Sequence, residues 1–473
     1  MLGLCEALRK IPEIEQLMQK IRDGTTTAVG GLGQIHKAHI IAAVRRFTGR
    51  PCVVVCADEL ACRRIASDIT ALSGEDVISL PYREPVFHHV ESASRDWEIL
   101  RLRAMYGLCV GTVPIVVTTP DALLLRTLPP DVLMSRTLSL KIGMRLDPRE
   151  LQKMLVASGY ARCDRVEGFG QFASRGGIVD FFSPAYAAPV RVDFFGDEID
   201  AMGFFDPEIQ RRTDNLRKAD LLPAREVLPD AAPGGTDGLI REIEKLIAQT
   251  KRRKKVPKEL EKCLSTDLER LRESGLFPGL DRYLPLVYPE MTTAFAYVPR
   301  TAVVFLEETG RLKERAEGFT WQMNEDIKGF LEAGTLAPGL TAFARYYDDL
   351  LEELPEKACV LLESFIGGNL FPRPRAILTV LAKQLPSYGG SLETAVQDVD
   401  HYRRGGYATV VLATSDRRVQ HLEELLRSVA ASIDLNLNEP PIPGTVTIGR
   451  GNLSGGFEYP AAKLAVIVEG QLF

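Results

Sequence analysis

The sequence lacks the features that mark membrane proteins and zinc proteins. No apolar run in its 473 residues approaches the roughly 20 residues that a membrane-spanning helix needs. The eight cysteines are scattered, and the closest three, Cys52, Cys56 and Cys62, do not have the spacing of a zinc site. Cys52 and Cys56 lie in or beside an apolar run, where cysteine acts as a small hydrophobe. We therefore expect a reduced, cytoplasmic chain without a structural metal.

Excess basic charge and familiar catalytic signatures are also missing. No GxSxG, HExxH or EF-hand pattern occurs, and the net charge is −5 with a pI of about 5.9. A protein that coats nucleic acid is usually basic, so any DNA contact here must be local. The basic run at 251–255 is more typical of a solvated helix face than of a DNA contact. His88 and His89 are adjacent in a predicted loop, but the sequence indicates no third ligand for a metal.

What the sequence does contain is an alternation of strands and helices. A chain of this length predicts about three domains. Residues 25–128 alternate apolar runs such as RPCVVVCADE (50–59) with helical spacing such as LACRRIASDITALSG (60–74). Runs that are apolar throughout are typical of strands buried on both faces. This order predicts a parallel, doubly wound α/β sheet.

The pattern changes after this first block. Residues 137–225 contain short alternating strands between glycine turns, which predict an antiparallel, β-rich insert. LPDAAPGGTDG (228–238) has the composition of a linker, and alternation typical of a sheet returns at 294–309. A last block of helices and strands begins near residue 350 and stops at LAVIVEGQLF, directly after a strand. From that abrupt end we expect a fragment of a longer protein.

A glycine-rich turn follows the first predicted strand, in TTTAVGGLGQIHKAHIIAAV (25–44). Against the phosphate-loop pattern G-x-x-x-x-G-K-[ST], Gly31 and Lys37 are in register, but His36 replaces the second glycine and Ala38 replaces the hydroxyl residue. A β-carbon in a left-handed position costs about 1–2 kcal/mol, and alanine offers Mg²⁺ no hydroxyl. We expect a degenerate loop that does not bind ATP tightly. The alternative is that Lys37 caps or solvates an ordinary turn.

Two acidic residues end a predicted strand much later in the chain. In VVFLEETG (303–310), Glu307 stands where a Walker B strand would place an aspartate, and Glu308 stands at the position of a general base. Acidic residues are common at strand ends, so this motif alone indicates little. Together with the register of the 31–38 turn, it indicates an ATPase lobe that has lost its ligands.

One predicted strand of the insert has an unusual polar face. In VRVDFF (190–195), alternation sends Val190, Val192 and Phe194 to one side of the sheet and Arg191, Asp193 and Phe195 to the other. The second set is polar except for Phe195. This phenylalanine would lie beside Arg191 on a solvated surface. Phe195 either packs under a neighbouring loop or serves as an interaction hot spot, since aromatic and arginine anchors dominate interface energies.

Several long stretches resemble the bacterial transcription-repair coupling factors, and in particular their UvrB-like module. They are GQFASRGGIVDFFSP (170–184), PVRVDFFGDEIDAMGFFDPEIQRR (189–212), DRYLPLVYPE (281–290) and GNLSGGFEYPAAKLAVIVEGQLF (451–473). The likeness runs nearly from end to end and is weakest at 230–275 and 310–380.

The resemblance implies an α/β multidomain architecture. A RecA-like, degenerate helicase lobe would consist of two segments, 1–130 and 226–345. A β-rich domain (131–225) would be inserted between them, and a small, separate α/β domain (350–473) would follow.

The resemblance also implies a role in nucleotide excision repair. In this family the module recruits the protein UvrA to a stalled transcription site, and the UvrA-contacting positions carry over to Arg175, Arg191 and Phe195. The family's RNA polymerase-binding domain and its ATP- and Mg²⁺-dependent translocase on double-stranded DNA lie further along than this chain reaches. No catalytic residue and no cofactor is therefore expected here.

Two alternatives belong to other functional classes. An active UvrB-like ATPase that loads onto damaged DNA is opposed by His36, by Ala38 and by the lack of an equivalent of UvrB's aromatic hairpin. A plain DNA-binding module is opposed by the net charge of −5.

Overall fold

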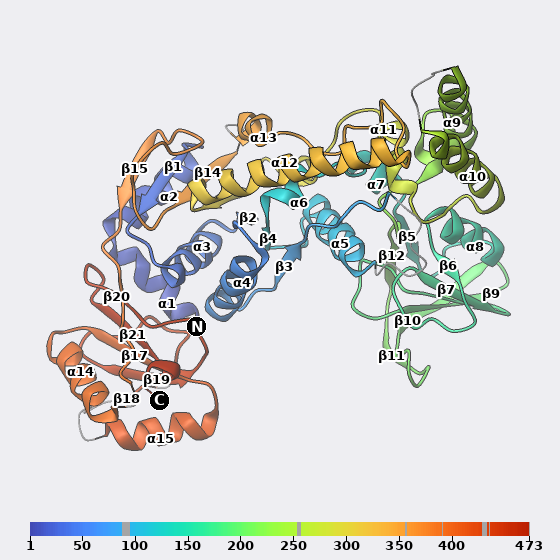
Figure 1. Cartoon of the computed structure of the whole chain (residues 1–473). Helices are drawn as coiled ribbons and strands as arrows, with labels where there is room; N and C mark the ends of the chain where they lie inside the picture. The colour runs from blue at the N-terminus through green and yellow to red at the C-terminus, as the bar shows by residue number, and fades with distance from the viewer. Residues whose placement is uncertain are drawn as a thin grey trace.

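A seven-stranded parallel sheet forms the centre of the part of the chain that the structure describes (Figure 1). This computed structural model describes residues 1–87, 95–252, 257–354, 357–389, 391–427, 433–434 and 436–472. The strand order is β15-β1-β14-β13-β2-β4-β3. The strands are β1 (Thr27–Gly30), β2 (Cys52–Val55), β3 (Val77–Leu80), β4 (Ile115–Thr118), β13 (Val303–Glu307), β14 (Ala358–Leu362) and β15 (Ala376–Thr379).

Both faces of this sheet are buried at β1, β2, β4, β13 and β14, as apolar strands predict, while the edge strands β3 and β15 are partly exposed. Val53 belongs to one hydrophobic core and its neighbour Val54 to the other, because successive side chains point to opposite faces. The lobe helices are α1 (Leu2–Ala7), α2 (Pro12–Arg22), α3 (Gln34–Thr48), α4 (Glu59–Ser73), α5 (Asp96–Val110), α6 (Pro120–Leu124), α7 (Pro130–Ser135), α12 (Thr309–Ala333) and α13 (Tyr347–Glu353), with the 3₁₀ turn η1 (Leu8–Lys10). The lobe therefore has the helix-covered parallel sheet that the sequence predicted.

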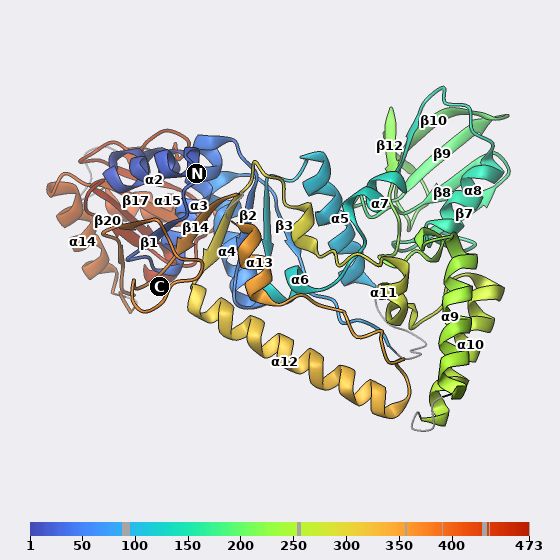
Figure 2. The same ribbon diagram turned by 90° about the horizontal axis from the view of Figure 1, so that it is seen from above.

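The β-rich insert forms a second body at one end of the lobe (Figure 2). Its larger sheet has the order β11-β10-β9-β8-β7-β6, and β12 pairs with β5 in a separate ribbon. The elements are β5 (Leu138–Lys141), α8 (Pro148–Ala157), β6 (Ala161–Arg162), β7 (Gln171–Arg175), β8 (Ile178–Phe181), β9 (Val190–Phe195), β10 (Glu198–Phe205), β11 (Arg212–Asn215) and β12 (Lys218–Leu221). One face packs on α8 through a core that includes Leu151, Leu155 and Val192.

A buried ion cluster fixes the point where the chain leaves the insert. Glu226 is fully buried and accepts hydrogen bonds from Arg83 (3.1 Å), Arg101 (2.8 Å) and Thr127 (2.5 Å). Arg83 also binds Asp281 at 2.6 Å. Burial alone would raise the pKa of Glu226, but the two arginines outweigh it and lower that pKa below its usual value. Residues far apart in sequence are thus tied together at the root of the insert.

A helical hairpin follows the insert and returns the chain to the lobe. Its elements are η2 (Pro229–Ala231), α9 (Gly235–Arg252), α10 (Lys258–Ser274), η3 (Leu280–Tyr283), α11 (Leu284–Val287) and η4 (Ala294–Tyr297). The predicted basic run begins at the end of α9, with Lys251 and Arg252 exposed, and its remainder at 253–255 lies outside the described residues. Of the sheet predicted over 294–309, only β13 is a strand.

The last segment forms a small α/β unit at the opposite end of the lobe from the insert (Figures 1 and 2). Its sheet has the order β16-β20-β21-β17-β19-β18. The elements are β16 (Lys383–Gln384), α14 (Leu392–Arg404), β17 (Ala408–Ala413), α15 (Asp416–Leu426), β18 (Ile433–Asp434), β19 (Val446–Arg450), β20 (Phe457–Tyr459), β21 (Leu464–Val468) and α16 (Glu469–Leu472).

Two features of this last segment differ from the prediction. β14 and β15 lie beyond residue 350, yet they pair with β1 and complete the first sheet, so the lobe reaches at least to Thr379 rather than to 345. The small unit is also not separate, because Val410, Phe457 and Leu464 share one core with Ile35 and other lobe residues. The α/β multidomain fold itself is confirmed.

In the described part of the chain, we find no helix that is both long enough and apolar enough to pass through a membrane.

Candidate functional site

The degenerate loop connects β1 to α3 much as the sequence predicted. Gly31 has φ +82°, a conformation that glycine adopts without steric cost, and Gly33 caps α3. His36 lies inside the first turn of the helix, where its Nδ1 accepts the Gly33 N–H at 3.0 Å. The position that holds a glycine in a phosphate loop thus holds a histidine that caps the helix.

His36 also joins the loop to the small C-terminal unit. Its ring centroid lies 5.7 Å from that of Phe457 and 5.2 Å from that of Tyr459. Burial lowers the pKa of His36 to about 4, so the imidazole is neutral at physiological pH. A neutral, packed imidazole offers no charge to a phosphate.

Lys37 meets the two acidic residues at the end of β13. Its ammonium nitrogen lies 3.3 Å from Glu307 Oε1 and 2.5 Å from Glu308 Oε1, and its side chain is 3% exposed. Burial alone would raise the pKa of Glu308, but hydrogen bonds from Lys37 and Ser364 outweigh it and lower that pKa. The structure therefore brings together the lysine and the two glutamates of the sequence motifs, and it holds the lysine in ion pairs with both of them.

The segments after β14 and β15 pack against the start of the loop. A β-carbon built on Gly31 would lie 2.4 Å from the carbonyl oxygen of Val380, and one built on Gly30 would lie 2.3 Å from the Ile366 side chain. The Val380 N–H donates to the Gly30 carbonyl at 3.0 Å. Ala38 is fully buried. The end of β1 and the first residue of the loop are therefore closely packed, and a side chain at either position would collide with its neighbours.

The polar face of the insert gathers the three residues that the resemblance singled out. Residues directly opposite each other in an antiparallel sheet share a face. Ile178 is paired with Arg175 on one side and with Asp193 on the other. Arg191, Asp193 and Phe195 are every second residue of β9, so their side chains point to the same face. Arg175, Arg191 and Phe195 therefore lie on one face, opposite the core that packs on α8.

Phe195 is the most exposed large hydrophobic residue of this face. Its side chain is 83% exposed at the end of β9, directly before Gly196, which has φ +65° in the turn to β10. One interpretation of the sequence was that Phe195 packs under a neighbouring loop. An exposure of 83% contradicts that interpretation, because no loop in the described part of the chain covers the ring. Ile178, which the sequence did not single out, is 37% exposed on the adjacent strand.

Arg191 is less accessible than its alternation with Phe195 predicted. Its guanidinium donates two hydrogen bonds to Asp180, at 2.7 and 2.8 Å, and a third to the Gln210 carbonyl at 3.1 Å. It also lies 4.6 Å from the ring centroid of Phe205. These hydrogen bonds raise the pKa of Arg191 above its usual value. Arg191 is therefore already held by its own domain, and its predicted contact with UvrA stays a prediction.

Arg175 ends β7 with an exposed side chain. Its guanidinium donates a hydrogen bond of 2.5 Å to the Asp164 carbonyl oxygen. Unlike Arg191, it has a main-chain oxygen rather than a carboxylate as its recorded partner. No sequence signal could distinguish these two arginines, because the pairing of Arg191 with Asp180 depends on strand register.

The metal site weighed at His88 and His89 could not be examined in the structure. His88 and His89 lie outside the described residues. Among the residues that the structure describes, no group of three His, Cys, Asp or Glu side chains could hold a metal ion.

Comparison with known proteins gives this geometry a family context. Residues 138–227, which contain the whole polar face, match the family model of the UvrB interaction domain. The chain resembles transcription-repair-coupling factors along nearly its whole length. It is 25% identical to that of Bacillus subtilis (strain 168) over 98% of this chain and 40% of the relative.

Two further comparisons complete this description. The coupling factor of Staphylococcus epidermidis (strain ATCC 12228) is 26% identical over 94% of this chain and 38% of the relative. The chain thus spans about 40% of the length of the coupling factors that it matches. A hypothetical ATP-dependent RNA helicase from Sulfolobus tokodaii aligns with a TM-score of 0.24 and 10% identity, which is too low to support an argument.

Proposed function

We propose that this chain is the N-terminal UvrB-like module of a transcription-repair coupling factor and that it recruits UvrA through the polar face of its insert. The observation that carries the proposal is the 83% exposure of Phe195 within the segment that matches the UvrB interaction domain. A phenyl ring in that position adds nothing to the core of its own domain. It has the properties of an anchor for another protein.

The surroundings of Phe195 define what its partner should offer. Arg175 supplies an exposed guanidinium, and Ile178 extends the apolar surface on the neighbouring strand. A complementary surface on UvrA would place an apolar depression over Phe195 and a carboxylate near Arg175, with a bidentate contact if geometry allows. Arg191 would act mainly by holding the sheet face in shape.

We propose that the chain performs no catalysis by itself. The packed loop around Lys37 supports this, because the groups of a nucleotide site are present only in part. Contacts with RNA polymerase and double-stranded DNA, and ATP-driven translocation, would belong to other parts of the coupling factor. The module would therefore work in the cytoplasm as a recruiting surface.

The test is a calorimetric titration of UvrA into the parent chain and into the Phe195→Ala variant. A central hot-spot residue contributes at least about 2 kcal/mol, so we expect binding to weaken roughly thirtyfold. The melting temperature should not fall, since the ring lies in solvent. Arg175→Ala should weaken binding less, as a rim charge does.

Phe365→Ala is the matched control. This phenylalanine is 89% exposed but belongs to the loop after β14, far along the chain from the insert. Its removal should leave the affinity for UvrA unchanged. Parental binding by Phe195→Ala would place the interface elsewhere, and unfolding of that variant would show that the ring supports the domain.

A further inference from the structure

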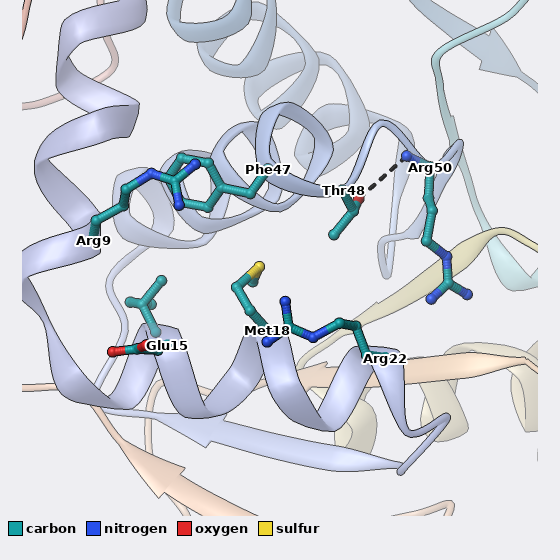
Figure 3. Close-up of a pocket in the computed structure, with 8 residues that line it drawn as sticks. Arg9, Glu15, Met18, Arg22, Phe47, Thr48 and Arg50 are labelled. Carbon is teal, nitrogen blue, oxygen red and sulfur yellow. Dashed lines mark hydrogen bonds between the residues drawn. The ribbon is translucent and has the colours of Figure 1, made fainter.

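A pocket on the lobe, formed by the first helices of the chain, is used by neither of the sites above. It has a volume of about 450 Å³ and lies between α2, the end of α3 and the start of β2 (Figure 3). Ligand pockets in proteins typically measure roughly 300–1,000 Å³. Its lining residues are Arg9, Ile14, Glu15, Met18, Arg22, Phe47, Thr48 and Arg50.

The apolar part of the pocket is built from three side chains. Ile14 and Met18 lie one turn apart on α2. Phe47 lines the same pocket from the end of α3, across from Met18 (Figure 3). Ile14 is 1% and Met18 8% exposed, so both present only a small surface to the pocket. The half-buried Phe47 therefore supplies most of the apolar surface, and its ring suits a flat apolar group.

Three guanidiniums surround this apolar part, and the nearby carboxylates are Glu15 in the lining and Glu6, which pairs with Arg9. Arg9 lies 4.0 Å from the ring centroid of Phe47, and its Nε donates to Glu6 at 2.8 Å. Stacking and ion pairing together fix the direction of this guanidinium. Most of its remaining N–H groups stay available to a ligand.

Arg50 is held in a different way at the other end. Its guanidinium donates to the main-chain carbonyls of Ile21 (3.1 Å), Thr301 (2.5 Å) and Ala302 (3.2 Å). Its recorded partners carry no negative charge, and burial lowers its pKa. Carbonyl groups position a cation without neutralising it, so the field of Arg50 remains in the pocket.

Arg22 is held by fewer contacts than Arg9 and Arg50. Its side chain extends from α2 toward Met18 (Figure 3), and its recorded hydrogen bond goes to Gln19, one turn earlier on the same helix, at 2.9 Å. An exposed guanidinium with one neutral partner can turn toward a ligand at little cost.

We propose that this pocket binds a small amphiphilic anion, in which an aromatic body packs on Phe47 and Met18 and a carboxylate or sulfonate accepts hydrogen bonds from Arg22 and Arg9. The charge pattern determines the sign of the ligand, since an anion reduces the repulsion among three cations, whereas a cation would add to it. The apolar floor determines its body, since inorganic phosphate alone would leave that surface uncovered.

The experiment uses the full chain and the aromatic sulfonate 8-anilinonaphthalene-1-sulfonate as the probe. We expect saturable fluorescence at one site per chain, and competition by 2-naphthoate but not by the cationic 2-naphthylmethylamine. Arg22→Gln should weaken binding roughly tenfold, which corresponds to the loss of a charge-assisted hydrogen bond. Phe47→Leu should weaken it as well, with melting curves to show that both variants fold.

Two matched variants separate this pocket from other surfaces. Arg64→Gln removes an exposed arginine from α4, and Phe365→Ser removes an exposed aromatic ring after β14. Both should bind the probe like the parent. The proposal is overturned if Arg22→Gln and Phe47→Leu bind like the parent, if Phe365→Ser abolishes the signal, or if the cationic competitor displaces the probe as well as naphthoate does.

Discussion

Arg191 and Arg175 share one sheet face but differ in what already holds their guanidiniums. Arg191 forms a forked pair with Asp180, which is 7% exposed, while Arg175 binds a main-chain oxygen. We predict that Arg191→Ala lowers the free energy of unfolding by about 1–3 kcal/mol, because a nearly buried carboxylate loses its partner. Urea unfolding followed by circular dichroism measures this.

Arg175→Ala provides the comparison on the same face. It should change the free energy of unfolding by no more than about 0.5 kcal/mol, as is usual for an exposed side chain. Arg191→Lys should restore only part of the loss, since an ammonium cannot make the forked contact. Equal stability of the Arg191→Ala and Arg175→Ala variants would show that the Asp180 pair contributes nothing.

Lys37 leads to a prediction about pH. The pKa of Glu308 is lowered in the folded chain, mainly because hydrogen bonds from Lys37 and Ser364 outweigh burial. A carboxylate with a lowered folded pKa stabilises the fold above its unfolded pKa, near 4.5, and loses this contribution as the pH falls through the folded value. Lys37→Met should therefore destabilise the chain more at pH 7 than at pH 4.

Urea unfolding of the parent and Lys37→Met at both pH values tests this. Lys313→Met is a suitable control, because the Lys313 side chain is 37% exposed and its ion pair with Glu317 lies on the surface of α12. Its effect should be small at both pH values. A penalty for Lys37→Met that stays constant with pH would contradict the assigned role of Glu308.

At the scale of elements, the local sequence pattern predicts individual helices and strands but does not predict which strands pair. The apolar run at 50–59 and the helical spacing at 60–74 became β2 and α4 nearly within those limits. β14 is equally apolar, yet its place beside β1 could not be predicted, since strand partners depend on contacts far apart in sequence. β15 follows two prolines and has one buried side chain among its four residues, so its pattern is weak.

The candidate sites show the same division. The convergence of Lys37 with Glu307 and Glu308 could be predicted, because a known motif relates them. The chain that packs against the loop at Val380 could not, and neither could the pairing of Arg191 with Asp180. Motifs predict which residues lie close together. The segments that pack against a loop and the partners of individual side chains depend on the packing of the whole fold.

The segment after β15 leads to a prediction about nucleotide. Because Val380 and Ile366 lie against the loop, we expect no stabilisation by Mg-ATP. A functional site at about 100 times its dissociation constant would add roughly 2.7 kcal/mol to the free energy of unfolding. Thermal melting with and without saturating Mg-ATP measures this directly.

Ala38→Ser sharpens the nucleotide experiment. It returns the missing hydroxyl, but at a fully buried position beside a closely packed loop, so we expect no gain of ATP binding. A rise in melting temperature in the parent chain that Lys37→Met abolishes would support the alternative of an active ATPase. A rise in Ala38→Ser alone would show that only the hydroxyl was lacking.

At the scale of the whole molecule, the small C-terminal unit and the lobe should unfold together. Phe457 on β20 is fully buried in a core that also contains Ile35 and Ile41 of α3, and its ring lies 5.2 Å from that of His39. Removing a buried phenylalanine costs about 3–5 kcal/mol. We predict that Phe457→Ala accelerates amide exchange in β1 and β2 as well as in β17 and β21, because one core supports both sheets.

Hydrogen exchange followed by mass spectrometry resolves these segments, and Met202→Ala is the matched control. Met202 is 1% exposed in the separate core of the insert, so its removal should accelerate exchange in β9 and β10 while β17 and β21 keep their protection. If Phe457→Ala accelerates exchange in the C-terminal unit alone, that unit is an independent domain. If it leaves β1 and β2 protected while Met202→Ala exposes them, cooperativity runs through the insert and its buried Glu226 cluster instead.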